Sequence, residues 1–177
     1  MKDIFEDIYD KYHHDLYKFV FYMVKDKYVT EDLIQDIYIK VLNSYHKFRG
    51  ESNEKTWLFS IARHTTIDYF RRQKRKRSRL QEFFDWNEKG SWLPDPKPLP
   101  EEVAERNDDI KNVFRFLDHC SPDQKSVLIL RYIQSFSIKE TAEILRFTES
   151  KVKTTQHRGL KILQDAFSSY EEKGGDV

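Results

Sequence analysis

Apolar residues recur at helical spacing through the first half of the chain and predict three helices there. Residues 4–24 form the first, with an apolar stripe made of Ile4, Ile8, Tyr12, Leu16, Phe19, Val20 and Met23. After a polar break, Thr30 is expected to cap a second helix, because Glu31 and Asp32 then lie in its first turn. The stripe of that helix consists of Leu33, Ile34, Ile37, Tyr38, Val41, Leu42 and Tyr45. A loop at residues 49–53 precedes a third helix, which starts near Glu54 and turns inward Leu58, Ile61, Ala62 and Thr65.

Helix-start signals are sharper in the second half of the chain. Asp108 or Asp109 can begin a helix that carries Ile110, Val113, Phe114 and Leu117. Residues 121–124 (Ser-Pro-Asp-Gln) combine a capping box with a proline at the first helical position, and the helix after them is expected to bury Val127, Leu128 and Tyr132. A second capping box at residues 137–140 opens a short helix with Ala142 and Leu145 inward. Thr148 caps a last helix, whose apolar residues are Val152, Leu160, Leu163 and Phe167. A frayed tail is expected after it, at residues 171–177.

Proline divides the chain once. Four of the five prolines fall between Pro94 and Pro100, where they alternate with other residues and so disrupt helices and sheet ladders alike. We therefore expect an extended linker over residues 80–106, between helical units at residues 1–79 and 107–170. No two-residue alternation of apolar and polar positions persists anywhere in the sequence, so the predicted fold class is all-α, with two small helical domains.

The net charge of +1 hides a strong segregation of charge. Residues 1–79 carry 17 Lys and Arg against 12 Asp and Glu, whereas residues 80–106 carry 3 against 7. Seven cations fall within the nine residues 71–79, which we call the basic run. A solvated helix face or a helix C-terminus would account for some of these cations. Seven exceed what a helix end needs, and they favour a polyanionic partner such as nucleic acid.

Two helices that are separated only by residues 146–148 (Arg-Phe-Thr) must turn sharply, as in a helix-turn-helix unit. Ala142 allows the two helices to approach closely, and Val152 packs behind it. The second helix then presents an outward row, suited to a DNA major groove, of Ser150, Lys151, Lys153, Thr154, His157, Arg158 and Lys161. The alternative is an ordinary four-helix domain with a solvated cationic helix.

Composition argues against an enzyme, a membrane protein and a metal protein. The longest apolar run, residues 19–24, is too short to span a bilayer. The single cysteine, Cys120, has no disulfide partner, which favours a reduced, cytoplasmic protein. The six histidines show no metal-ligand spacing with a carboxylate, and five glycines form no phosphate-binding loop. We therefore expect no catalytic residue, no metal, no cofactor and no small-molecule substrate.

Several strings, in order, resemble one family. Residues 30–36 (TEDLIQD), 55–63 (KTWLFSIAR) and 67–72 (IDYFRR) are similar to region 2 of the extracytoplasmic-function (ECF) sigma factors of RNA polymerase. Residues 128–132 (LILRY) and 140–145 (ETAEIL), with Val152 and Lys153 after them, resemble region 4. The stretch at residues 22–27 is also similar to the sigma-X type within this family. The resemblance covers about residues 5–79 and 108–167 and implies a factor that directs promoter-specific initiation of transcription.

The resemblance implies that the second helix binds the clamp coiled coil of the polymerase core. The residues at the matching positions are Asp32, Gln35, Asp36, Ile39 and Lys40. Asp32 has a second explanation, because an acid is favourable near a helix N-terminus. Gln35 and Asp36 lie deeper in the helix, where the dipole offers them nothing.

The third helix and the loop before it would, by the same resemblance, read and melt the −10 element. The loop would hold a flipped base against a rim formed by Arg49, Ser52, Asn53, Glu54 and Lys55. Along the helix, the strand would be faced by Arg63, His64, Asp68, Arg71 and Arg72. Trp57 is a stacking candidate, although an aromatic of its size is more often a core residue. His64 stands where the family commonly has Asn, and an imidazole lacks the paired donor and acceptor of an amide.

The −35 element would be bound by the last helix, through Lys151, Lys153, Thr154, His157, Arg158 and Lys161. Four positions depart from the family pattern. Arg146 replaces a common glycine, Thr155 and Leu160 replace frequent cations, and Gln156 replaces an aliphatic residue. These departures affect which bases are read.

The family resemblance also implies an inhibitory partner, an anti-sigma factor that is often anchored in the membrane and would hold the protein at its inner face. A competing interpretation is a helix-turn-helix transcriptional regulator that does not bind core polymerase. Such a regulator would normally carry a ligand-binding or dimerisation domain, which this sequence does not indicate. Binding to the polymerase core discriminates between the two.

Overall fold

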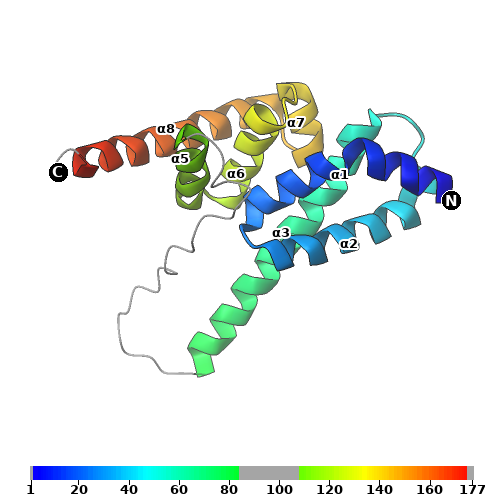
Figure 1. Cartoon of the computed structure of the whole chain (residues 1–177), viewed down its shortest axis with the longest axis horizontal. Coiled ribbons are helices and arrows are strands. Elements are labelled where there is room, and N and C mark those ends of the chain that lie inside the picture. Colours follow the sequence, from blue (N-terminus) through cyan, green and yellow to red (C-terminus); the bar gives the residue numbers. More distant parts are fainter. Residues whose placement is uncertain (1, 84–107, 175–177) are drawn as a thin grey trace.

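The computed structural model describes residues 2–83 and 108–174 (Figure 1), and every regular element in these residues is a helix. The all-α fold class predicted from apolar spacing is therefore confirmed. The proline-rich segment at residues 94–100 lies outside the described residues. None of the helices in the described part of the chain is long and apolar enough to cross a bilayer.

Three long helices build the first domain. α1 (Lys2–Val24) and α2 (Lys27–Ser44) pack against each other, and α3 (Glu54–Phe83) packs across both after the short turn η1 (Tyr45–Lys47). The predicted apolar stripes meet in its core, where Phe19 of α1 lies edge-on to Phe59 of α3, with ring centroids 5.6 Å apart. Ile4, at the end of the first stripe, stays partly exposed. The second half of α3 projects away from the rest of the molecule (Figure 1).

The start of α2 differs from the prediction. Asp26, not Thr30, is the N-cap, and its side chain accepts a hydrogen bond from Val29 N at 3.1 Å. Thr30 is fully buried inside the helix, where its hydroxyl donates to the Asp26 carbonyl oxygen at 2.7 Å. Lys25 explains the earlier start, because its left-handed backbone (φ 57°) ends α1 directly before Asp26, which then caps α2.

The second domain contains α5 (Asp108–Phe116), η2 (Leu117–His119), α6 (Pro122–Leu128), η3 (Ile129–Ile133), α7 (Ile138–Leu145) and α8 (Glu149–Gly174). Both predicted capping boxes are present, at the starts of α6 and α7. Thr148 also acts as predicted, since its hydroxyl accepts from Lys151 N at 3.1 Å. α8 continues through Gly174 and so extends past residue 170, where the frayed tail was expected to begin. Within the predicted part of the helix, the rings of Phe167 and Tyr170 reach Phe116.

Tyr132 was expected in the core and is instead 56% exposed. The reason is η3, a π-helical segment in which Gln134 N donates to the carbonyl oxygen of Ile129, five residues earlier. A π turn is wider than an α turn and rotates the following side chains off the α-helical stripe. Ile129 and Leu130 fill the core in place of the tyrosine.

The two domains pack directly on one another. α3 contacts α7, while α1 contacts α6 and η3 (Figure 1). Buried apolar residues of both domains join into one continuous cluster. This closeness of the two domains was not visible in the sequence, and it changes the surroundings of several candidate site residues.

Candidate nucleic-acid and polymerase interfaces

The outward face of α8 is cationic and open. All six residues assigned to the −35 element are exposed, namely Lys151, Lys153, Thr154, His157, Arg158 and Lys161. On the opposite side of the helix, Val152 is fully buried and Gly159 lies against Leu128, whose Cδ1 would be 3.0 Å from a Cβ at that glycine. Buried small residues on one side thus seat α8 on α6 and turn its cations outward.

The turn before α8 has the tight geometry expected of a helix-turn-helix unit. Arg146 caps α7 in the left-handed region (φ 54°, ψ 41°), as its place at a common glycine position suggested. Phe147, the next residue, has Lys151 Nζ 3.7 Å from its ring centroid on one side. The guanidinium carbon of Arg63, from α3, lies 5.9 Å from the same centroid. Phe147 therefore links a candidate −35 residue to a candidate −10 residue.

The structure ties most of the predicted rim of the −10 loop to protein partners. Asn53 caps α3 by accepting from Lys55 N at 2.8 Å. The carboxylate of Glu54 accepts from the hydroxyls of Tyr12 at 3.0 Å and Tyr45 at 3.3 Å, and burial with Glu54 nearby raises the pKa of both tyrosines. Two rim residues do not take part in these contacts. Arg49 is exposed at the tip of the loop, and Ser52 is half-buried.

Lys55 points away from the loop and towards the rest of the protein. Its ammonium pairs with Asp15 of α1 at 2.9 Å. It also lies over the ring of Phe136, in the second domain, at 5.3 Å. Lys55 thus acts here as a packing cation rather than as an open contact for DNA.

Trp57 is half-buried in an aromatic group rather than wholly inside the core. Its ring lies 4.8 Å from Phe48 and 5.9 Å from Tyr45, measured between centroids. One side of the tryptophan therefore packs on the domain, and part of its surface remains accessible beside the loop.

Along α3, the carboxylate of Asp68 lies close to two other residues that were assigned to the −10 strand. His64 Nε2 lies 3.3 Å from its carboxylate, and Arg71 lies 3.6 Å from it. Arg72 is exposed, with its Nε donating to the Asp68 carbonyl oxygen at 3.4 Å. All seven cations of the basic run, Arg71 and Arg72 among them, are exposed, and the other five follow on the projecting half of α3.

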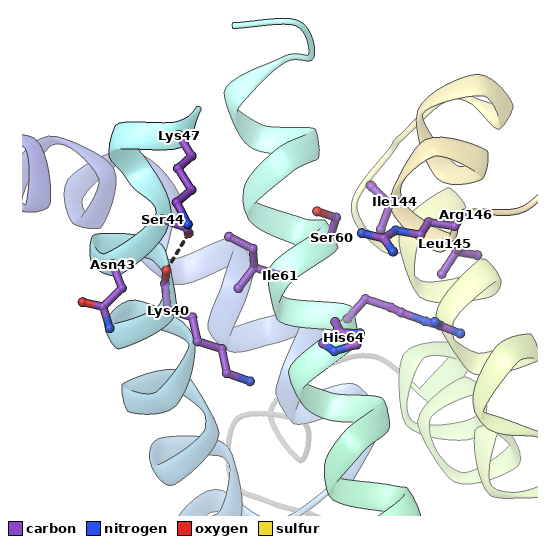
Figure 2. A pocket seen from close by; sticks show the side chains of 11 residues that line it. Lys40, Asn43, Ser44, Lys47, Ser60, Ile61, His64, Ile144, Leu145 and Arg146 are labelled. Atoms are coloured by element: carbon purple, nitrogen blue, oxygen red, sulfur yellow. Dashed lines mark hydrogen bonds between the residues drawn. The ribbon is translucent and has the colours of Figure 1, made fainter. Parts of the chain in front are cut away.

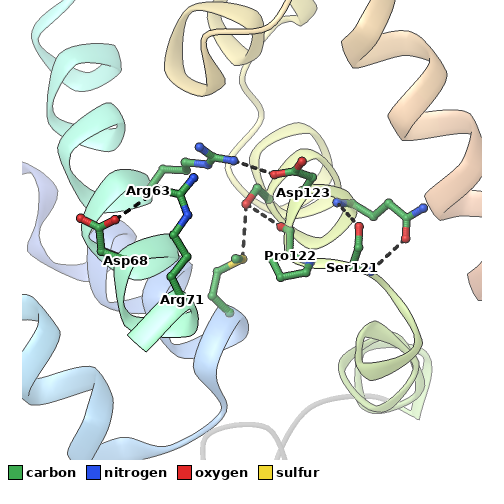
Figure 3. A network of polar contacts seen from close by, with 9 residues as sticks. Arg63, Asp68, Arg71, Ser121, Pro122 and Asp123 are labelled. Atoms are coloured by element: carbon green, nitrogen blue, oxygen red, sulfur yellow. Dashed lines mark hydrogen bonds and ion pairs between the residues drawn. The ribbon is translucent and has the colours of Figure 1, made fainter. Parts of the chain in front are cut away.

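Arg63 behaves differently from its neighbours, because it crosses to the second domain. Its Nη2 donates to the carboxylate of Asp123 in α6 at 2.6 Å (Figure 3). The Arg63 side chain is 16% exposed, and this burial lowers the pKa of the guanidinium, an effect that Asp123 opposes. A guanidinium retains its charge under all ordinary conditions, so the contact is a true ion pair.

The proposed polymerase-binding face of α2 is open. Asp32, Gln35 and Asp36 are exposed, and Ile39 is an exposed apolar side chain at 57%. Lys40 is partly engaged, since its ammonium donates to Thr65 Oγ1 of α3 at 3.0 Å. Buried residues on the other side, Ile37 above all, orient this face outward.

A cleft of about 630 Å³ lies between the first domain and the end of α7 (Figure 2). Its lining includes five cationic or titratable side chains, and no carboxylate contributes to it: Lys40, Asn43, Ser44, Lys47, Ser60, Ile61, Arg63, His64, Ile144, Leu145 and Arg146. Cations from both domains are therefore brought near one another there.

Sequence reasoning found no metal-ligand spacing among the histidines and missed that His13 belongs to an aromatic stack. The imidazole stacks on Tyr9 with centroids 4.2 Å apart, and its Nδ1 is 3.2 Å from the Tyr38 hydroxyl. Burial lowers the pKa of His13 and raises that of Tyr38. The spacing of Tyr9 and His13, one helical turn apart, was the available signal.

Comparison with known proteins identifies both domains. The model of Sigma-70 region 2 matches residues 8–76, and that of Sigma-70, region 4 matches residues 111–163. The ECF RNA polymerase sigma factor SigX of Bacillus subtilis (strain 168) is 56% identical over 164 residues, which cover 93% of this chain and 84% of SigX. The RNA polymerase sigma factor YlaC of the same strain is 32% identical over 173 residues, 97% of each chain.

A solved structure agrees across both domains. The sigma factor RpoE from Bartonella quintana, in complex with the anti-sigma factor NepR, has a TM-score of 0.68 and 25% identity, over 95% of this chain and 98% of RpoE. Region 2 and region 4 thus follow one another in a fold shared with a known sigma factor. This chain belongs to the ECF sigma factors of RNA polymerase, which are not enzymes but proteins that initiate transcription.

Proposed function

We propose that the two domains divide the work of promoter recognition. Residues 1–79 bind core polymerase and the −10 element, residues 107–170 bind the −35 element, and residues 80–106 connect them. The observation that carries this division is the row of exposed cations on α8, which stands opposite a fully buried Val152. A helix seated in this way can enter a major groove with its charged face towards DNA.

Core polymerase binds to the exposed face of α2. Asp32, Gln35 and Asp36 offer polar contacts there, and Ile39 adds an apolar one in their midst. An exposed isoleucine among acids suits a partner helix with matching basic and apolar residues, such as the clamp coiled coil. Lys40 contributes at the edge of this face while it holds Thr65.

The −10 element is read at the loop and along α3. Arg49 and Ser52 are available at the loop, with Trp57 beside them as a partly covered stacking surface. Arg63, His64, Asp68, Arg71 and Arg72 follow along α3, and single strands are generally bound by such combinations of aromatic faces and cations. Asn53, Glu54 and Lys55 support the loop from within through their contacts to the protein.

The partners of the protein are core polymerase, promoter DNA and an anti-sigma factor. RpoE, the fold relative described above, was solved in complex with an anti-sigma factor, and this supports the third partner. The protein works in the cytoplasm, where polymerase and DNA are found. A membrane-anchored anti-sigma factor would hold the protein at the inner face of the membrane.

Transcription in vitro tests the proposal. Core polymerase with a promoter library is assayed with and without the protein, and transcripts that start at a shared pair of −10 and −35 elements are expected only in its presence. Absence of promoter-dependent initiation, together with DNA binding that ignores core polymerase, would instead favour a helix-turn-helix regulator.

A further inference from the structure

Gln156 interrupts the inner side of α8. This side of the helix is otherwise without polar side chains: Val152 is fully buried, Gly159 lies against Leu128, and Leu163 packs on the core. Gln156 lies between Val152 and Gly159 at helical spacing and is itself half-buried. A polar side chain that is withdrawn from water costs free energy unless a protein partner replaces the lost hydrogen bonds. The amide of Gln156 therefore needs such a partner inside the domain.

The partner is Arg131, in the middle of the π-helical segment η3. Its Nε donates to Gln156 Oε1 at 3.0 Å. A guanidinium has donors only, so the amide turns its oxygen towards Arg131, and this fixes the orientation of the glutamine side chain. The same π segment that leads Tyr132 into solvent thus points Arg131 at α8.

Arg131 also holds the start of α7. Its Nη1 donates to the carbonyl oxygen of Phe136, which lies just before the capping box of that helix. The connection from η3 to α7 is tight, because Phe136 N donates to the Leu130 carbonyl oxygen at 2.9 Å and Ser135 has a left-handed backbone (φ 59°). One guanidinium thus connects the start of α7 with the second turn of α8. We call the contacts of Arg131 with Gln156 and Phe136 the brace.

The brace restricts the rotation of α8 about its own axis. Gln156 directly precedes His157 and follows Lys153 by three residues, and side chains of one helix keep fixed directions relative to each other. A rotation that moved Gln156 away from Arg131 would therefore swing the whole exposed row of α8 by the same angle. It would also leave two partly buried polar groups without their hydrogen bond, which is unfavourable. Apolar contacts are non-directional and restrict such a rotation less.

We propose that Gln156 is a positioning residue for the −35 element, which acts through Arg131 by fixing the direction in which the exposed row of α8 faces DNA. The inference rests on the proposed assignment of that row to the −35 element. Gln156 contributes without touching DNA, because it sets which base pairs Lys153, His157 and Arg158 meet. Loss of the brace therefore lowers the preference for one sequence, while the general attraction to phosphates remains.

The test compares base preference with general DNA affinity, for the full chain bound to core polymerase. Selection from a random-sequence duplex library, with the sequences retained by core polymerase alone subtracted, gives the preferred −35 sequence. Fluorescence anisotropy then gives the affinities for a labelled duplex of this sequence and for a mixed-sequence duplex, and the ratio of the two is the preference. Urea unfolding of the full chain measures stability.

Gln156→Leu removes the hydrogen-bond acceptor and keeps a side chain of similar size. Its preference should fall at least about fivefold, which is the size of a lost base contact. Affinity for the mixed duplex should stay within about twofold with the same salt dependence, since no phosphate contact is lost. Stability should not decrease, because leucine gains apolar burial at a half-buried position. Gln164→Leu makes the same exchange at an exposed position of α8 and should match the wild type.

Two further variants separate positioning from packing. A carboxylate oxygen in Gln156→Glu can accept from Arg131 as the amide oxygen does, so its preference should lie closer to the wild type than to Gln156→Leu, although the added negative charge weakens binding to both duplexes. Arg131→Lys keeps the charge and loses the planar fork, so it should lose preference as Gln156→Leu does. The two changes combined should cost no more than either alone, because they break one contact.

An unchanged preference in Gln156→Leu would overturn the proposal. So would a loss of preference that accompanies lower stability and is not recovered in Gln156→Glu, because that result indicates packing alone. Arg158→Ala is measured in the same assay to test the underlying assignment. If it leaves the preference intact, the assignment of α8 to the −35 element fails; if it lowers the preference while Gln156→Leu does not, the brace alone is wrong.

Discussion

Arg146 sits at the end of α7 with a backbone conformation that side chains disfavour. Its φ of 54° lies in the left-handed region, which costs a non-glycine residue about 1 kcal/mol. We therefore expect Arg146→Gly to raise the free energy of unfolding by up to about 1 kcal/mol. Urea unfolding followed by circular dichroism measures it. Arg146→Ala removes the same charge and keeps the strain, so equal stabilisation by both variants would point to charge instead.

Gly159 is needed where α8 crosses α6. A Cβ at this position would lie 3.0 Å from Leu128 Cδ1, closer than side chains normally pack. Gly159→Val should lower the free energy of unfolding by about 1–3 kcal/mol, as overpacking does in cores. Ser168→Val, on an exposed part of the same helix, introduces the same β-branched side chain without a core neighbour. Thermal unfolding of both variants is the measurement, and an equal loss of stability from both would contradict the packing explanation.

Among the helices, the projecting half of α3 has a strongly positive surface. α3 has 30 residues and so spans about 45 Å, with the exposed basic run along its free half. Changing Lys74, Arg75, Lys76 and Arg77 to Gln should weaken binding to matched and mismatched promoters alike, because phosphate contacts carry no sequence information. The slope of log affinity against log salt should fall by roughly 0.9 for each duplex phosphate that the variant no longer neutralises. Selective weakening on one promoter with an unchanged slope would contradict this role.

Across the whole molecule, mutations in the two domains should impair different binding functions. Arg158 is exposed on α8, one helical turn beyond Thr154, where a guanidinium can reach a guanine or a phosphate. Arg158→Ala should weaken recognition of the −35 element by about 1–3 kcal/mol and leave core binding intact. Asp36→Arg, on the exposed face of α2, should have the converse effect. Core affinity and −35 binding are measured side by side, and loss of core binding in Arg158→Ala with normal −35 binding would reject the division.

Local structure was largely predictable, and its exceptions have local causes. The capping boxes at Ser121 and Ser137 and the cap at Thr148 were read from neighbouring residues, because caps depend on contacts within one turn. The prediction of a buried Tyr132 was wrong because it assumed an α turn where the chain forms a π turn. The Thr30 cap was wrong because Asp26, an equally good cap, follows the left-handed Lys25.

The candidate site was predictable in its composition and only partly in its surroundings. The cations of α8 and the basic run were expected on the surface from charge alone, since isolated charges are rarely buried. Lys55 and Glu54 have the same residue types as an open rim, yet they bind Asp15 and two tyrosines from elsewhere in the fold. Such partners lie many positions away in the chain, and no local pattern announces them.

The helices, their polar and apolar faces and the family could all be inferred from the amino-acid sequence, because periodicity, caps and motifs are properties of short segments. How the two domains meet became known from the three-dimensional fold, and with it the partner of Arg63, which is Asp123, 60 residues away in the chain. An ion pair of this kind depends on the packing of Phe114 and Phe136 against the first domain, and so on the three-dimensional arrangement of both halves. Physical contact between distant segments is set by shape and burial together, which a linear pattern does not contain.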